Sequence, residues 1–79
     1  MRIYVKAVDG EIVKFITLDV DTTDIVVKIK QKVQDLLGFR PEQQKFVYSG
    51  KLLEDDVVLA DCDIRAESTI LLTLDCRGS

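Results

Sequence analysis

The chain has 79 residues and a mass of 8.9 kDa, which is room for one small domain and excludes a two-domain enzyme. Hydrophobic residues make up 47% of it and charged residues 32%, a balance that supports a compact core and excludes an intrinsically disordered chain. A net charge of −3 argues against binding nucleic acid through a strong positive field.

Two strands joined by a tight turn are predicted at the start of the chain. Residues 2–8 alternate apolar and polar side chains, the period of two that is typical of a strand with one buried face. Asp9-Gly10 favours a turn, and residues 13–20 alternate again. We therefore expect a β-hairpin with one apolar face, which carries Ile3, Val5, Ala7, Ile16, Leu18 and Val20.

A helix is predicted over residues 24–37, the only long helix of the chain. The segment 21–24, Asp-Thr-Thr-Asp, offers candidate N-cap side chains, and Gly38 followed by Pro41 should end the helix. Apolar residues at spacings of three and four indicate a stripe that packs on a sheet, and lysines lie off that stripe. The stripe contains Val26, Ile29 and Val33, and the solvated edge is expected to contain Lys28, Lys30 and Lys32.

The rest of the chain predicts short elements. We expect a turn at 41–44, a strand at 45–48, a small partner strand at 51–53, a short helical turn within 57–64 and a last strand at 70–74. Residues 1–74 would form one domain and residues 75–79 a mobile tail. The order of elements indicates an α+β fold in which one sheet covers one helix.

Few residues in the chain suit catalysis or metal binding. There is no histidine, and Cys62 and Cys76 lack CxxC spacing, which excludes a zinc site, a Cys-His nucleophile and a disulfide scaffold. The acidic run 54–56 is best explained as a solvated turn, because a one-helix domain has little depth for a cleft. We expect no enzyme activity and no cofactor. Without a membrane span or a signal peptide, a cytoplasmic or nuclear location is expected.

Two long runs of the sequence are specific enough to indicate a family. Residues 38–55, GFRPEQQKFVYSGKLLED, and residues 61–70, DCDIRAESTI, resemble the ubiquitin family, as does the opening MRIYVK. The resemblance covers essentially the whole chain. It implies the β-grasp fold, a mixed sheet packed on one helix, which agrees with the order of elements expected from periodicity alone.

Departures from the ubiquitin pattern affect the tail and the first hairpin. Ubiquitin ends in two glycines, whose terminal carboxylate is activated for conjugation, whereas this chain ends Arg77-Gly78-Ser79. Asp75 also replaces an arginine that the ubiquitin-activating enzyme reads. Both changes count against conjugation, although removal of Ser79 would expose Gly78. The first hairpin is about three residues longer than in ubiquitin, and Cys62 replaces a tyrosine.

The resemblance also implies a binding surface on the outward face of the sheet. Its apolar positions are Val8, Val47 and Leu71, with Thr73 where ubiquitin has valine, and alternation along the strands independently turns Val47 and Leu71 away from the helix. Scattered surface aliphatics are the ordinary alternative. The basic side chains expected to border this surface are Lys6, Lys45 and Lys51.

Tyr4 and Phe15 are expected to be a second outward pair. If the hairpin register follows ubiquitin, they lie opposite each other. An exposed aromatic pair of this kind is better explained as a contact that stabilises the hairpin than as a second surface for a partner.

Three functions remain open from the sequence. The preferred hypothesis is a monomeric, non-conjugated interaction domain, a module of a longer protein of the ubiquitin–proteasome system, whose partners are ubiquitin-binding domains or proteasome receptors rather than nucleic acid or membrane. The alternative is a modifier conjugated through its tail after processing, with Arg77 and Gly78 as the tail residues concerned. The third is a regulatory domain of an enzyme, with no catalytic residue of its own.

Overall fold

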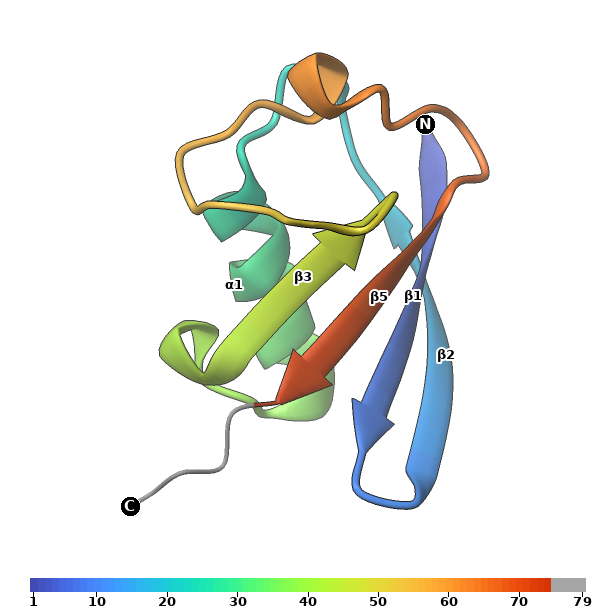
Figure 1. Cartoon of the computed structure of the whole chain (residues 1–79), viewed down its shortest axis with the longest axis vertical. Helices are drawn as coiled ribbons and strands as arrows, with labels where there is room; N and C mark the ends of the chain where they lie inside the picture. Colours follow the sequence, from blue (N-terminus) through green and yellow to red (C-terminus); the bar gives the residue numbers. More distant parts are fainter. Residues whose placement is uncertain (75–79) are drawn as a thin grey trace.

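The computed structural model describes residues 1–74 and shows one five-stranded sheet packed against one helix (Figure 1). The strand order is β2-β1-β5-β3-β4, in which β1 and β5 are parallel and the other neighbours antiparallel. This mixed sheet confirms the predicted α+β, β-grasp architecture. The elements are β1 (Arg2–Asp9), β2 (Ile12–Asp19), α1 (Val26–Leu37), η1 (Pro41–Gln43), β3 (Gln44–Tyr48), β4 (Lys51–Leu52), η2 (Leu59–Cys62) and β5 (Thr69–Leu74).

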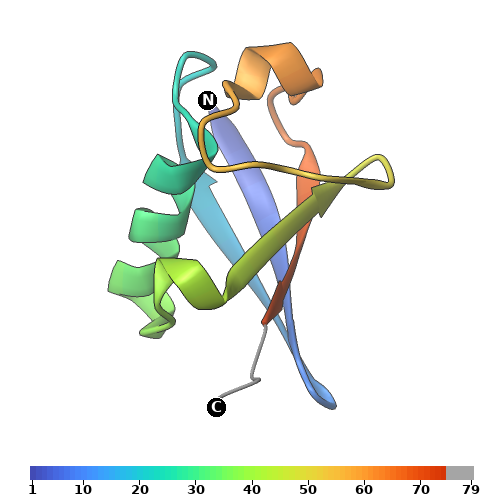
Figure 2. The same cartoon turned by 60° about the vertical axis from the view of Figure 1, so that its left-hand side comes forward.

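The core lies between the sheet and α1. Figure 2 shows α1 against one face of the sheet, with the opposite face uncovered. The core contains the side chains that alternation and helical spacing predict, because the alternate apolar residues of each strand face the helix. The buried apolar residues are Ile3, Val5, Ala7, Leu18, Val20, Val26, Ile29, Val33, Phe46, Leu53, Leu59, Ile64, Ile70 and Leu72.

The first hairpin closes with a two-residue turn. Asp9 pairs with Ile12, and Gly10 between them has a φ of 61°, a conformation that glycine adopts without steric cost. This turn fixes the register of the whole hairpin, so that Tyr4 lies opposite Thr17 and Phe15 opposite Lys6. The expected direct pairing of Tyr4 with Phe15 is therefore wrong: the two aromatic residues are diagonal neighbours on the same face.

The helix begins two residues later than predicted, and no side chain of segment 21–24 caps it. Ile25 is the N-cap residue and offers no capping side chain; instead the amides of Val26 and Val27 donate to the backbone oxygens of Val57 and Asp55, both at 3.0 Å. Propensity favoured a polar cap, but the loop that crosses the helix start supplies carbonyl oxygens to the same unpaired amides. At the other end Gly38 has a φ of 84° and closes the helix as expected.

Lys30 is a second correction, because it is not on a solvated edge. Only 8% of Lys30 is exposed, and its Nζ lies 2.5 Å from Oδ1 of Asp55 in the crossing loop. Gln44 ties the same turn of α1 to the start of β3, since its buried Nε2 donates to the oxygens of Lys30 and Phe39, both at 2.9 Å. The ion pair with Asp55, which is distant in sequence, therefore buries a lysine that its position on the helix predicted to be solvated.

The remaining elements follow the predictions with shifted ends. The turn at the start of β3 is the 3-10 helix η1, the helical turn expected within 57–64 contracts to η2, and β4 has two residues instead of three. No helix within residues 1–74 is long and apolar enough to cross a membrane.

Candidate functional site

The face of the sheet turned away from α1, called the outer face here, carries a row of residues that crosses all five strands. Phe15 on β2 lies opposite Lys6 on β1, and Lys6 lies beside Leu71 on β5. Leu71 lies opposite Val47 on β3, and Val47 opposite Leu52 on β4. Because paired residues of neighbouring strands point to the same side of a sheet, these five side chains form one line. We call it the central row.

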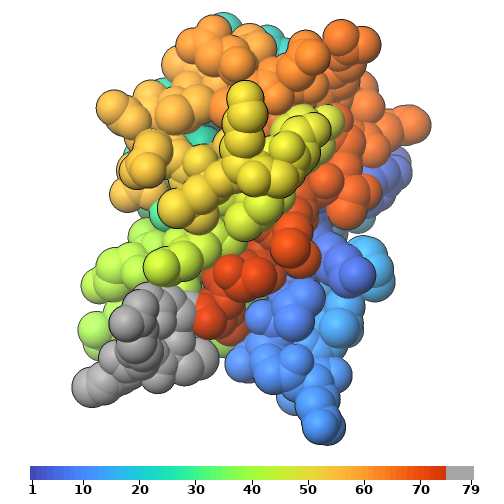
Figure 3. All heavy atoms as spheres, viewed as in Figure 1, coloured from blue at the N-terminus to red at the C-terminus, as the bar shows by residue number. Residues whose placement is uncertain are grey.

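A second row lies two residues further along the strands, on the same face of the sheet. It joins Val13 on β2, Val8 on β1, Thr73 on β5 and Lys45 on β3. The two rows bring together six of the seven expected surface residues: Lys6, Val8, Lys45, Val47, Leu71 and Thr73. Figure 3 looks onto this side of the molecule, where β5 (red) runs between β3 (yellow-green) and β1 (blue).

The aliphatic side chains of these rows are not part of the core. Val8, Val47 and Leu71 are half-buried, whereas their neighbours Ala7, Phe46 and Leu72 are buried. The alternation is the one expected when one face packs on a helix and the other meets solvent. These aliphatic residues are therefore free to contact a partner without disturbing the core.

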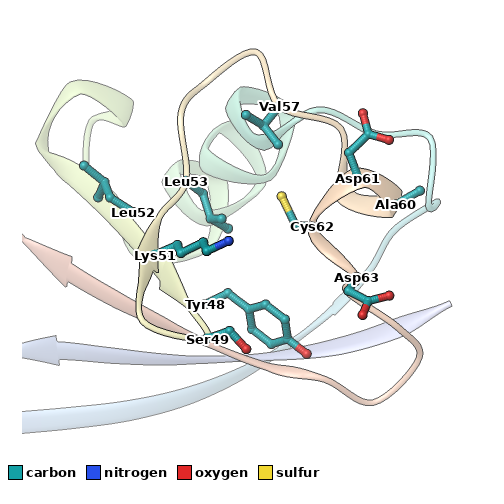
Figure 4. Close-up of a pocket in the computed structure, with 10 residues that line it drawn as sticks. All are labelled: Tyr48, Ser49, Lys51, Leu52, Leu53, Val57, Ala60, Asp61, Cys62 and Asp63. Carbon is teal, nitrogen blue, oxygen red and sulfur yellow. The ribbon is translucent and has the colours of Figure 1, made fainter.

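Lys51 is the expected residue that the structure places elsewhere. It lies opposite Tyr48, on the other parity from Val47 and Leu52. Figure 4 shows its side chain directed toward a separate pocket of about 550 Å³, which Leu52 also lines. The pocket is also lined by Val57 and by residues of η2, among them Cys62. Lys51 therefore borders this pocket more closely than the outer face.

Cys62 lines that pocket, and its surroundings disfavour ionisation of its thiol. It is half-buried against the core, and burial raises the pKa of its thiol, as does the nearby Asp61 carboxylate; the Lys51 ammonium opposes them. A raised pKa leaves little thiolate, the nucleophilic form, at neutral pH. Cys62 is less buried than the sequence suggested, because the pocket opens beside it.

Three exposed apolar residues of the outer face were not predicted to join the binding surface. Phe15 is 68% exposed, Leu52 55% and Val13 47%. Phe15 was assigned to a pair with Tyr4, and the membership of Leu52 depends on the register of a strand of two residues, which alternation cannot predict. The available signal for Phe15 was its parity, because the alternation along residues 13–20 places it on the face opposite Ile16 and Leu18.

The outer face offers contacts for a partner and no reactive group. Its centre is aliphatic, and Lys6 places an ammonium group within it that makes no ion pair or hydrogen bond with the described residues. Within residues 1–74 no group of three or more acidic, cysteine or histidine side chains could hold a metal ion. The arrangement is suited to non-covalent recognition. The tail residues Arg77 and Gly78 lie outside the described residues.

Comparison with known proteins gives the same family throughout. A family model described as "Ubiquitin family" matches residues 3–77. The chain is 36% identical to "Ubiquitin-like protein NEDD8" of Dictyostelium discoideum, over 99% of this chain and 97% of that protein. It is 37% identical to "Ubiquitin-like protein 1" of Schizosaccharomyces pombe, over 99% and 96%. A "Ubiquitin-like protein 1-ribosomal protein eS31 fusion protein" of Caenorhabditis elegans is 38% identical over 77% of this chain and 35% of that protein.

Proposed function

Because the chain belongs to the ubiquitin family, we propose that it is a protein-interaction domain that partners recognise non-covalently through its outer face. The observation that carries this proposal is the central row, in which Leu71 and Val47 lie at the middle of the sheet face that residues 1–74 leave uncovered. The partners we propose are ubiquitin-binding domains, including those of proteasome receptors. The protein itself performs no catalysis in this role.

The outer face carries apolar side chains that the core does not need, and this supports a role in binding. The core closes without Val8, Val47 and Leu71, so their aliphatic surface stays in contact with solvent. Adjacent apolar residues rimmed by polar ones are typical of interaction sites, more so than isolated ones. Lys6 and Lys45 supply a basic rim in a chain whose net charge is −3, which favours partners that present acidic groups next to apolar ones.

The proposal is tested by titrating a ubiquitin-binding domain into the wild-type protein and into Val47→Ala and Leu71→Ala. Truncation of an interface anchor costs about 1 kcal/mol or more, so each variant should weaken binding by about fivefold or more. Ile12→Ala is the matched control, because Ile12 is an exposed aliphatic residue, 57% accessible, on the other parity of β2 from Phe15. Unchanged affinity in both outer-face variants would contradict the proposal.

The relatives favour a second candidate, a modifier conjugated through its C-terminus. The NEDD8 and ubiquitin-like protein 1 relatives match nearly end to end, so the chain resembles short proteins as well as modules. In this role Ser79 would be removed and the Gly78 carboxylate, next to Arg77, would be the attachment point. Intact-mass measurement of the endogenous protein distinguishes the two: a free species that ends at Gly78, with larger adducts, supports the modifier, and a longer single product supports the interaction module.

The outer face serves both candidates. A conjugated modifier also has to be recognised by binding proteins, so the mutational test above applies in either case. The cytoplasmic or nuclear location and the monomeric state stay predictions.

A further inference from the structure

The strand β2 is a free edge of the sheet and carries a run of exposed apolar side chains. β1 pairs with one side of β2, and no strand within residues 1–74 pairs with the other side. Figure 1 shows β2 at this margin of the sheet, beside β1. Three of the most exposed apolar residues of the described chain lie at its start: Ile12, Val13 and Phe15. An exposed apolar edge strand is a template for pairing with a further strand.

The free backbone groups of this edge belong to alternate residues. The amide of Val20 donates to the oxygen of Met1 at 2.8 Å, and the amino group of Met1 donates to the oxygen of Val20 at 2.6 Å. The backbone groups of Val20 therefore point toward β1. Because this direction alternates along a strand, Val13, Phe15 and Thr17 direct their amides and carbonyls away from the sheet. Among residues 1–74 these outward groups have no backbone partner.

From this edge we infer that two copies of the protein form a two-fold symmetric dimer, in which their β2 strands pair antiparallel with Phe15 opposite Phe15 of the second copy. The chain is a monomer at low concentration, as expected from the sequence, and the dimer forms as the concentration rises. The dimer goes beyond the proposed function and does not depend on it, because it uses the edge of the sheet and leaves Val47 and Leu71 uncovered.

Hydrogen bonding and charge together favour the register centred on Phe15. In this register all three outward-facing residues of one copy meet those of the other, and opposed residues point to the same side of the joined sheet. A register centred on Lys14 would bring two ammonium groups together. One centred on Ile16 would place the Val13 side chain against the carboxylate of Asp19.

The same register inserts an exposed side chain of one copy into a hollow of the other. On the side of the sheet that faces α1, Ile12 of one copy lies opposite Leu18 of the second copy. Leu18 lines a hollow of about 320 Å³ between β2 and α1, and Leu36, 60% exposed, lines it from the helix. Two-fold symmetry makes this contact twice. A second copy is therefore the occupant that fits, because one chain supplies both the inserted side chain and the hollow that receives it.

The charges around the hollow also favour the contact. Lys14 is the only charged residue within 12–18, and a lysine on an edge strand commonly opposes pairing. It lies on the same side of β2 as Ile12, so the long side chain of the second copy's Lys14 can bring its ammonium group to the rim of the hollow. The rim carries the carboxylates of Asp19 and Asp35, which outnumber the ammonium group of Lys32.

Sedimentation equilibrium of the full 79-residue protein, from about 10 µM to about 1 mM, measures the association. Reductant is present, so that cysteines of different copies stay unlinked. Ile12→Lys and Leu36→Glu each change one half of the proposed contact. Leu52→Glu is the matched control, because Leu52 is a similarly exposed leucine at the opposite edge of the sheet. Thermal unfolding of each variant confirms that it is folded.

We expect Leu52→Glu to associate as wild type does. Each of the other two variants should weaken association about 25-fold, because each altered contact costs about fivefold and occurs twice in the dimer. An equimolar mixture of Ile12→Lys with Leu36→Glu should recover the dimer. In that mixed dimer one contact is the native pair of isoleucine and leucine, and the other pairs the introduced lysine with the introduced glutamate.

Hydrogen exchange gives an independent measurement of the strand pairing. At high protein concentration the outward-facing amides of Val13, Phe15 and Thr17 should exchange more slowly than at low concentration, because they gain partners in the second copy. The amides of Lys14 and Ile16 already face β1, so their exchange should change little.

Three results would overturn the dimer. The first is a wild-type protein that stays monomeric at the highest concentration. The second is association that both edge variants leave unchanged, or that Leu52→Glu weakens equally, since the contact would then lie elsewhere. The third is a loss in Ile12→Lys without a loss in Leu36→Glu, or a mixture that does not recover, since β2 would then pair in another register or accept any extended strand.

Discussion

Val47 and Leu71 lie directly opposite each other across the antiparallel β3–β5 pair, at the middle of a sheet face that no other element within residues 1–74 covers. Each is flanked along its own strand by a residue that the core does bury, Phe46 and Leu72. The same backbone therefore holds a core residue and a surface residue side by side. This separation allows binding to be changed by mutation without loss of stability.

The clearest test of that separation is a pair of neighbouring leucines. Leu72→Ala removes a fully buried side chain, with 0% exposure, and should lower the free energy of unfolding by about 2–5 kcal/mol. Leu71→Ala should lower it by less than about 1 kcal/mol, because that side chain is only partly buried and lies on the face opposite the core. Urea unfolding of both variants measures the difference. Equal losses would mean that Leu71 is a core residue.

Asp24 should contribute a pH-dependent part of the stability. Its carboxylate accepts from the amide of Asp21 at 3.0 Å and from Nζ of Lys28 at 3.2 Å, and these interactions, the backbone hydrogen bond foremost, hold its pKa below the ordinary value of 3.8 despite burial. A carboxyl group whose pKa is lowered by folding stabilises the protein above its unfolded pKa, and this contribution is lost as the pH falls through the folded pKa.

Asp24→Asn should therefore be less stable than wild type at pH 6, and the difference should shrink as the pH is lowered below about 4, where the unfolded-state carboxyl group begins to protonate. Urea unfolding of both proteins in steps from pH 6 to pH 2 measures this difference. A gap that stays constant over the whole range would show that the charge of Asp24 contributes nothing.

The ion pair between Lys30 and Asp55 should be asymmetric in its mutational effects. Asp55→Ala leaves the ammonium of Lys30, whose side chain is 10% exposed, without its partner and should destabilise the protein by about 1–2 kcal/mol. Lys30→Met replaces the buried cation with an apolar side chain of similar length and should be nearly neutral or stabilising. The double variant should resemble Lys30→Met. An Asp55→Ala protein as stable as wild type would contradict this account.

We predict that the tail residues keep the chain from entering the ubiquitin conjugation pathway. Ser79 adds bulk at the residue that would react, and Asp75 carries negative charge where ubiquitin carries positive. Misplacement of a reacting group by about 1 Å can cost on the order of 100-fold in rate, so no thioester with the ubiquitin-activating enzyme is expected under conditions that charge ubiquitin fully. Asp75→Arg, Cys76→Leu and Ser79→Gly together should restore some charging. Efficient charging of the unmodified chain would refute this prediction.

The fold was largely predictable because its signals are local and mutually consistent. Alternation placed Ile3, Val5 and Leu72 in the core, helical spacing placed Ile29 and Val33 there, and Gly38 marked the helix end. Local patterns of this kind survive in the structure because each agrees with the burial that the whole fold requires.

The errors arise where distant segments meet. The start of α1 and the burial of Lys30 both depend on the loop at residues 54–57, which lies about 25 residues away in sequence, as the separation of Lys30 and Asp55 shows. The register of the first hairpin depends on a single turn at Gly10. The sequence alone did not fix this register, so Phe15 was predicted to lie opposite Tyr4, whereas it lies opposite Lys6. The alternation of apolar and polar residues predicts which face of the sheet a residue lies on, but it does not predict the residue opposite it on the next strand. The central row could therefore be identified only from the structure.

The central claim is that partners bind the outer face, and chemical-shift mapping by NMR tests it most directly. A ubiquitin-binding domain is titrated into the ¹⁵N-labelled protein, and the amide shifts are followed residue by residue. The account predicts that the largest changes cluster at Lys6, Val8, Lys45, Val47, Leu71 and Thr73, which come together only in the folded sheet. Changes concentrated on the exposed side of α1, or on the pocket beside Cys62, would contradict it.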